Sequence, residues 1–129
     1  MKVLRPKFDA NGLVPVIVQD AKNLRVPMLA YANEEAYLLT LKTGLATFWS
    51  RSRGKIWVKG EESGNLMPMV GLPLIDCDGD ALIYFVMPAG PACHTNQETC
   101  FYRSVSSVDK AQFPSEKEAL EVMEAEVCI

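Results

Sequence analysis

The sequence contains no apolar run long enough to cross a membrane and no apolar core of a secretion signal near its start. A membrane span needs roughly 18 consecutive apolar residues, whereas the longest candidate here, residues 81–87, has the length of a buried strand. The first seven positions include charged residues, which a signal peptide would follow with an apolar stretch. We therefore expect a cytoplasmic protein with no membrane partner.

An excess of basic residues is also absent. The chain has 13 Lys and Arg against 16 Asp and Glu, which gives a formal net charge of −3. A nucleic-acid-binding protein would normally show a basic face or stripe, so we expect no nucleic-acid partner. A small phosphorylated substrate stays possible, because a local basic cluster can bind phosphate in an acidic protein. Repeats, low-complexity tracts and linkers are missing as well, and 129 residues fit a single domain, 1–129.

Short β-rich segments recur along the chain and are separated by polar turns. A hairpin is predicted early in the chain, and the stretch at residues 67–75 is interrupted by Pro68 and Pro73, which favours an edge strand. The expected strands are residues 14–18, 28–31, 47–49, 56–58, 82–87 and 101–103.

Two segments carry the signals of helix ends. Asn33 is a suitable N-cap and Gly44 a suitable C-terminal glycine, and the helix between them has an apolar face of Tyr37, Leu38 and Leu41. Ser115 and Glu118 form a capping box that opens a second helix at residues 116–126. The predicted fold class is α+β, with mainly antiparallel strands and two helices.

The most informative segment is the acidic turn at residues 76–80. Asp76, Asp78 and Asp80 alternate with Cys77 and Gly79. Carboxylate oxygens suit Mg²⁺ or Ca²⁺, and a thiolate suits zinc. An acidic surface turn beside a buried cysteine is the plain alternative. An EF-hand loop is excluded, because the twelfth position counted from Asp76 is a methionine and not the required glutamate.

A second candidate metal segment holds Cys93 and Cys100, with the only histidine, His94, beside the first cysteine. Together with Cys77 they would give a three-cysteine zinc site, which leaves the fourth position open for water as catalysis requires. Zinc can lower the pKa of a bound water to roughly 7. His94 is then a general acid or base, or a fourth ligand. Structural thiols and a hydrogen-bonded loop histidine are the alternative.

Two polar loops offer groups for a phosphorylated substrate. The basic turn contains Ser50, Arg51, Ser52 and Arg53. Arginine side chains match phosphate oxygens in a bidentate manner, although a solvated hairpin tip has the same composition. A second loop follows, with three polar residues that a ligand could reach: Lys59, Glu61 and Ser63.

In this order along the chain, these segments resemble the phosphoribosyl-AMP cyclohydrolases of histidine biosynthesis. The acidic turn at 76–80 and the Ala-Cys-His-Thr segment at 92–95, followed by Cys100 and Phe101, are the most specific blocks. The similarity runs from about Leu13 to Arg103, and its other blocks are residues 16–21, 28–31, 33–36, 49–55, 59–61 and 63–65.

The resemblance implies an intertwined homodimer with metal sites at its interface. Zinc would be bound by Cys77 of one subunit and by Cys93 and Cys100 of the other, and Mg²⁺ by Asp76, Asp78 and Asp80. Water activated by zinc would open the adenine ring of N1-(5-phosphoribosyl)-AMP at the C6–N1 bond, with His94 as the catalytic residue. The substrate would contact Ser50, Arg51, Ser52, Arg53, Lys59, Glu61 and Ser63.

The sequence departs from the family pattern at several positions. Val58 replaces a usual arginine, Glu62 a threonine, Met67 a glutamine and Asn96 a glycine, and the turn near Asn23 lacks its usual glycine. These departures leave two alternatives open. One is a divergent paralogue that hydrolyses another purine-like or amidine substrate. The other is a non-catalytic zinc-binding protein.

Overall fold

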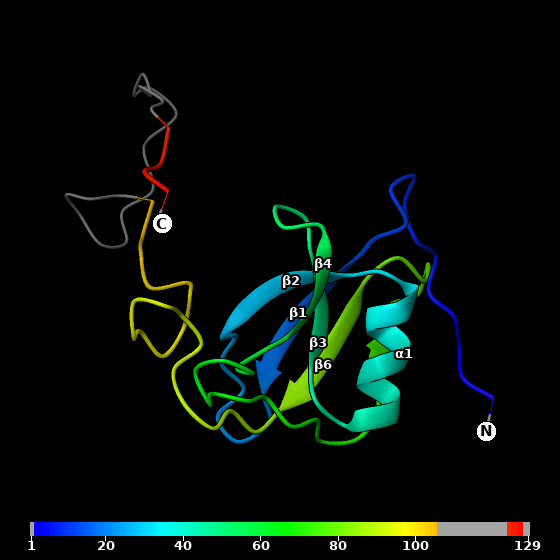
Figure 1. Cartoon of the computed structure of the whole chain (residues 1–129), viewed down its shortest axis with the longest axis horizontal. Coiled ribbons are helices and arrows are strands. Elements are labelled where there is room, and N and C mark those ends of the chain that lie inside the picture. The colour runs from blue at the N-terminus through cyan, green and yellow to red at the C-terminus, as the bar shows by residue number, and fades with distance from the viewer. Residues whose placement is uncertain (1, 106–123, 128–129) are drawn as a thin grey trace, which may run out of the picture.

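A four-stranded sheet and a separate two-stranded hairpin make the framework of the computed structural model, which describes residues 2–105 and 124–127 (Figure 1). The order of the larger sheet is β2-β1-β6-β5, and β3 pairs with β4. The elements in chain order are β1 (Val14–Asp20), β2 (Met28–Ala32), α1 (Glu34–Thr43), β3 (Thr47–Ser50), β4 (Lys55–Val58), β5 (Leu74–Ile75) and β6 (Leu82–Val86).

The strand pairings confirm a mainly antiparallel sheet and add one parallel pair. β1 and β2 form the predicted hairpin with Val16 opposite Ala30, and β5 is an edge strand that pairs antiparallel with β6. β1 and β6 run parallel, with Val16 opposite Leu82. Parallel neighbours need a long crossover connection. Here all the other described elements lie between the two strands along the chain, so local sequence patterns could not indicate this pairing.

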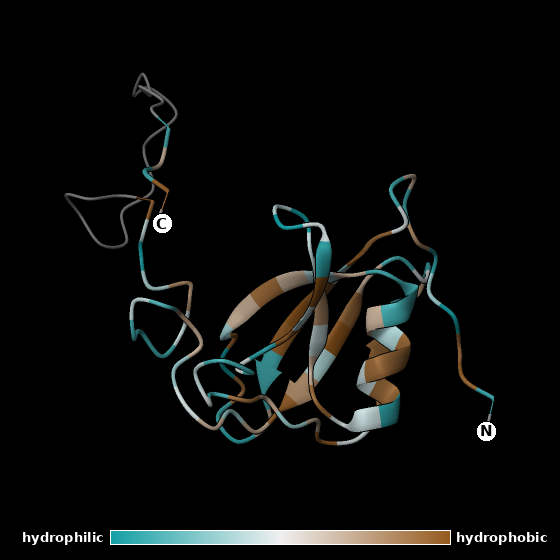
Figure 2. Cartoon of the chain, viewed as in Figure 1, coloured by the Kyte–Doolittle hydropathy of each residue, from teal (hydrophilic) through white to brown (hydrophobic). Residues whose placement is uncertain are grey.

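One face of the larger sheet is buried against α1 and the β3–β4 hairpin, and alternate residues of its strands point to that face. Val16 in β1 and Tyr84 in β6 are fully buried, and the Tyr84 ring stacks 5.9 Å from the ring of Phe48 in β3. The opposite face remains partly open, with Ile17 and Ile83 half-buried and Leu29 43% exposed. Figure 2 shows that β1 and β6 are hydrophobic over most of their length. In a strand with one face in water, polar residues normally alternate with apolar ones. Here the open face carries apolar residues, which suggests that it is covered by something other than this chain.

The predicted caps of α1 are confirmed. Asn33 accepts a hydrogen bond from the Ala36 amide at 2.9 Å through its side-chain oxygen, and Gly44 ends the helix in the left-handed conformation with φ 74°. The predicted apolar face is wrong in one member, because Leu38 is 48% exposed while Tyr37 is buried. Successive residues are about 100° apart around a helix, so a residue next to the buried one turns towards solvent.

The predictions for the C-terminal region were a strand at residues 101–103 and a helix at residues 116–126. Residues 101–103 do not form the expected strand. Residues 116–123 of the second predicted helix lie outside the described residues, and residues 124–126 are not helical. In the described ranges, α1 has only ten residues, and no helix has the length and apolarity needed to cross a membrane.

Leu24 occupies the turn between β1 and β2 in a left-handed conformation, with φ 65°. This conformation costs an L-amino acid about 1–2 kcal/mol, and glycine avoids most of that cost. The Leu24 side chain is 62% exposed, so its removal loses little packing. We expect Leu24→Gly to raise the free energy of unfolding by about 1 kcal/mol in urea denaturation. Leu24→Ala is the control, since alanine keeps the strain. Equal stability of the two variants would contradict this account of the turn.

Candidate active site

The acidic turn between β5 and β6 is folded by its own first carboxylate. Asp76 accepts hydrogen bonds through Oδ1 from the amides of Asp80 at 2.9 Å and Ala81 at 3.2 Å. Gly79 allows the turn with φ 78°. As predicted, the three aspartates come together, and one ligand oxygen from each lies within 4.8 Å of the others at the exposed surface: Asp76, Asp78 and Asp80.

The carboxylates perturb one another's protonation. Partial desolvation raises the pKa of Asp76, but the hydrogen bonds its carboxylate accepts outweigh this and hold the pKa below its usual value. A side-chain hydrogen bond with Asp76, together with repulsion from Asp78, raises the pKa of Asp80. Three hard oxygen donors crowded at one point favour a divalent cation such as Mg²⁺ or Ca²⁺.

The two cysteines of the second metal segment are brought together by a tight loop, residues 92–100. The amide of Cys93 donates to Gln97 O at 3.2 Å, and the amide of Asn96 donates back to Cys93 O at 3.0 Å. Thr95 donates its hydroxyl to Cys93 Sγ at 3.0 Å, and this hydrogen bond is the main reason that the Cys93 pKa is lowered. A side-chain hydrogen bond with Cys100 acts in the same direction. A lowered thiol pKa favours the thiolate, the form that binds metal.

Thr95 was not predicted as a site residue. Its signal is visible in the sequence only with hindsight, as a hydroxyl two residues after a cysteine in a turn-forming segment. His94, the predicted catalytic residue, lies exposed between Cys93 and Thr95. The loop therefore offers a thiol pair, a hydroxyl donor and an imidazole within a few residues.

The loop of residues 92–100, called the thiol-bearing loop below, is anchored on one side to the end of the β1–β2 turn. The amide of Cys100 donates to Pro27 O at 2.7 Å, and the Thr99 hydroxyl donates to Val26 O at 2.7 Å. An exposed ion pair joins Arg25 to Glu98 at 3.3 Å. These contacts fix Cys100 beside residues 25–27, directly before β2.

A second anchor comes from the polar loop after β4. Lys59 Nζ donates to Ala92 O at 2.5 Å, directly before Cys93. Burial lowers the pKa of Lys59, while the nearby Cys100 and Cys93 raise it. Gly60 follows with φ 83°, and a Cβ there would lie 2.2 Å from the Asn65 backbone, so only glycine fits this position. Lys59 is thus held in place by the local backbone.

The other residues predicted in this loop remain at the surface. Glu61 and Ser63 are exposed, and the Ser63 hydroxyl accepts a hydrogen bond from the Asn65 amide at 3.2 Å. Both side chains are open to solvent, on the loop after β4 whose Lys59 contacts Ala92.

Cys77 lies apart from the other two cysteines within one chain. It is exposed in the turn before β6, whereas the thiol-bearing loop follows the other end of β6, on the opposite side of the molecule (Figure 1). Among the described residues, the acidic turn is the only group of three His, Cys, Asp or Glu side chains close enough to hold an ion together. A single chain therefore assembles two of the three predicted zinc ligands.

The basic turn forms the tip of the β3–β4 hairpin, as predicted. The Arg51 guanidinium lies 4.0 Å from the centroid of the Tyr31 ring, and that of Arg53 lies 5.8 Å from the Trp57 ring. Ser50 Oγ accepts hydrogen bonds from the Arg53 amide at 3.2 Å and from its Nε at 3.3 Å, and contacts Ser52 Oγ at 3.5 Å. Neither arginine forms an ion pair with a described carboxylate. Both keep their charge available to an anion.

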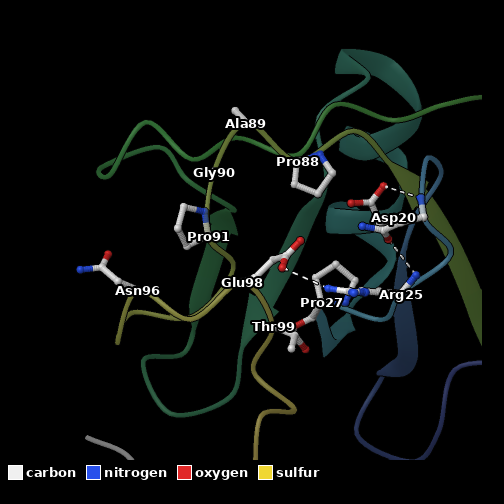
Figure 3. Close-up of a pocket in the computed structure, with 11 residues that line it drawn as sticks. Asp20, Arg25, Pro27, Pro88, Ala89, Gly90, Pro91, Asn96, Glu98 and Thr99 are labelled. Carbon is white, nitrogen blue, oxygen red and sulfur yellow. Dashed lines mark hydrogen bonds and ion pairs between the residues drawn. The ribbon is translucent and has the colours of Figure 1, made fainter.

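A cavity of about 330 Å³ adjoins the thiol-bearing loop on the side of the β1–β2 turn (Figure 3). Its one lining guanidinium, Arg25, is paired with Glu98, and Asp20 accepts the amide of Lys22 at 2.8 Å. None of the predicted site residues lines this cavity. The predicted substrate groups instead lie on the exposed hairpin tip and the loop after β4.

The structure accounts for two departures from the expected pattern. Asn96 has φ 66°, a conformation that suits glycine and that asparagine tolerates better than most residues. Met67 is fully buried in the core, so its side chain does not face a ligand. Val58 is half-buried in β4, and Glu62 is exposed.

Comparison with known proteins gives a consistent result. A family profile described as Phosphoribosyl-AMP cyclohydrolase matches residues 28–102, more than half of the chain. A phosphoribosyl-AMP cyclohydrolase of Archaeoglobus fulgidus is 60% identical over 97 residues, which cover 75% of this chain and 89% of that protein. One from Methanoregula boonei is 59% identical over 102 residues, covering 79% of this chain and 82% of that protein.

A longer relative names the pathway. The histidine biosynthesis bifunctional protein HisIE of Thermus thermophilus is 54% identical over 104 residues, which cover 81% of this chain and 48% of that protein. The matched part is therefore about half of a two-function protein.

Proposed function

Since the chain belongs to the phosphoribosyl-AMP cyclohydrolase family, hydrolases that act on a cyclic amidine, we propose that it opens the adenine ring of N1-(5-phosphoribosyl)-AMP in histidine biosynthesis. The bond broken is C6–N1. Substitution at N1 weakens the aromaticity of the ring and leaves C6 electrophilic, so water can add there. Collapse of the tetrahedral adduct leaves a carboxamide, and no ammonia is lost.

The observation that carries this proposal is the pair of thiols, in which the pKa of Cys93 is lowered. Cys93 and Cys100 interact through their side chains, and the Thr95 hydroxyl favours the Cys93 thiolate. Soft thiolates of this kind suit zinc, and three of them leave a fourth position open. Zinc bound there would supply the Lewis acidity that activates water near neutral pH. His94, exposed beside Cys93, would move the proton between water and the departing N1.

The third thiol is best supplied by a second copy of the chain. Cys77 lies exposed at the far end of β6 from the other two, so a shared site needs a partner that presents its own acidic turn to the thiol-bearing loop. The open face of the larger sheet, with Ile17, Leu29 and Ile83, is apolar enough to be covered in a homodimer. We therefore place the zinc sites at a dimer interface, each next to the acidic turn of the other subunit.

Mg²⁺ is the cation that we assign to Asp76, Asp78 and Asp80, since carboxylate oxygens and substrate phosphate are its preferred ligands. In a shared site the acidic turn would lie near the thiols of the partner, because it also contains Cys77. The residues assigned to the substrate are Ser50, Arg51, Ser52, Arg53, Glu61 and Ser63, with the two guanidinium groups at the phosphates.

Removal of charge from the hairpin tip tests the phosphate assignment. We expect Arg51→Gln and Arg53→Gln each to raise KM about tenfold, because a charge-assisted hydrogen bond contributes about 1.5–3 kcal/mol. Lys42→Gln, at the exposed end of α1, is the control and should leave KM unchanged. Steady-state kinetics on each variant measure KM and kcat/KM. Unchanged KM and kcat/KM in the Arg51→Gln, Arg53→Gln double variant would remove these residues from the phosphate site.

The direct test of the function combines turnover with metal analysis. The purified protein, supplied with N1-(5-phosphoribosyl)-AMP, should produce the ring-opened carboxamide, followed by its absorbance, and should contain one zinc per chain. Zinc without turnover would favour a non-catalytic metal protein. Turnover of a different amidine in preference to this substrate would favour a divergent paralogue.

A further inference from the structure

Lys59 makes its closest contact with the backbone of the thiol-bearing loop. Its Nζ donates to the carbonyl of Ala92 at 2.5 Å, and Ala92 is 2% exposed. Because Ala92 directly precedes Cys93, this hydrogen bond constrains the peptide group from which the first thiol extends. The same ammonium lies 5.3 Å from the centroid of the Trp57 ring, within the range of a cation–π contact. Lys59 is thus held by a hydrogen bond and by an aromatic ring.

No carboxylate among the described residues forms an ion pair with Lys59. The ion pairs in the described part of the chain are Arg5 with Glu34 and Arg25 with Glu98, and Lys59 is in neither. The acidic groups close enough to influence the half-buried ammonium are the thiols of Cys93 and Cys100. A partly buried charge is unfavourable unless it is compensated. The natural compensation here is thiolate charge.

We propose that Lys59 is a positioning residue of the metal centre, which holds the Cys93 backbone through Ala92 and offsets the negative charge of the metal-bound thiolates. The inference deepens the proposed function, on which its zinc site rests. Three thiolates around a divalent zinc leave one net negative charge, and an ammonium beside two of them balances it. Less negative charge at the centre also favours a more acidic activated water.

This role differs from the direct substrate contact that the resemblance implies for Lys59. A lysine that binds a substrate phosphate would present its ammonium at the surface, where the exposed hairpin tip carries Arg51 and Arg53. Lys59 is instead half-buried and bonded to a carbonyl that belongs to the thiol-bearing loop. The two roles predict different kinetic effects, since a phosphate contact changes KM, and support of the metal centre changes metal affinity and kcat.

The test uses Lys59→Met, which removes the charge at similar volume, and Lys59→Arg, which keeps it. Zinc affinity is measured on the full-length protein by competition with a chromophoric chelator. Outer-shell groups typically change metal affinity 10–100-fold, so we expect Lys59→Met to weaken zinc binding about tenfold and to lower kcat at saturating zinc with KM unchanged. Lys59→Arg should recover most of the affinity. Lys42→Met is the matched control and should bind zinc as the wild type does.

Titration of the metal-free protein with Co²⁺ gives a readout independent of turnover, through the thiolate-to-metal charge-transfer absorption. A Lys59→Met protein with wild-type Co²⁺ and zinc affinity, whatever its KM, would overturn the proposal. If Lys59→Met does not fold, Lys59→Gln, which keeps a donor without charge, carries the same expectation. A wild-type protein that binds Co²⁺ through thiols but does not hydrolyse phosphoribosyl-AMP would refute the proposed function and leave the role of Lys59 decided by the titration.

Discussion

Replacement of Cys93 by alanine is expected to release zinc and to lower kcat by about a thousandfold or more, since Lewis-acid activation is worth several kcal/mol of transition-state stabilisation. Cys93 is the buried member of the thiol pair and the one whose thiolate Thr95 favours, so its loss removes the ligand best prepared to bind metal. Elemental analysis and steady-state kinetics on the dialysed protein measure the two effects.

The folding of the Cys93→Ala protein must be separated from its loss of metal. Alanine fits the Cys93 position without strain, so urea denaturation of the variant and of metal-free wild type should give similar midpoints. Thr95→Val is a graded comparison, since it removes the hydroxyl donor and keeps all three thiols. We expect it to retain zinc with weaker affinity. Stoichiometric zinc in Cys93→Ala would show that the ligand set is wrong.

Mixing two inactive variants should restore activity if the zinc site is shared between subunits. In a heterodimer of Cys77→Ala and Cys93→Ala chains, one of the two sites draws all its ligands from unaltered positions. Random exchange of subunits at equal concentrations gives about half heterodimers, so activity should reach about a quarter of the wild-type value. The expectation follows from the separation of Cys77 from the thiol pair within one chain.

The matched control is a mixture of Cys93→Ala and Cys100→Ala. Both substitutions alter the same loop, so each site of their heterodimer lacks one ligand and no activity should return. Subunit exchange is verified beforehand by mass spectrometry of differently tagged chains. No recovery in the first mixture, or equal recovery in both, would exclude a site built from Cys77 of one subunit and the thiol-bearing loop of the other.

Local signals in the sequence predicted local structure well. The caps of α1 at Asn33 and Gly44 and the hairpin tip at the basic turn follow from residue chemistry within a few positions, and the structure has them. The parallel pairing of β1 with β6 was missed, because it depends on the path of the chain through all the elements between the two strands. The exposure of Leu38 was missed because an apolar residue beside a buried one looks the same in sequence.

The candidate site shows the same division. Clustering of Asp76, Asp78 and Asp80 was predictable from their spacing around one glycine, and the structure confirms it. The contact between Lys59 and Ala92 spans 33 positions and joins two loops with no common pattern, so the sequence placed Lys59 in a loop that a ligand could reach and did not indicate this contact. The resemblance to the cyclohydrolases, carried by whole motifs, went further than spacing alone.

The parallel neighbours β1 and β6 also govern the order in which the molecule can assemble. β1 is synthesised first, but its second neighbour appears only after residue 82, so the centre of the sheet cannot close until most of the described chain has emerged. Contacts between distant segments slow folding, because a large loop must be ordered before they form. The thiol-bearing loop follows β6, and its anchors at Pro27 and Lys59 precede it along the chain, so Cys93 and Cys100 take their places among the last, on supports that have already been synthesised.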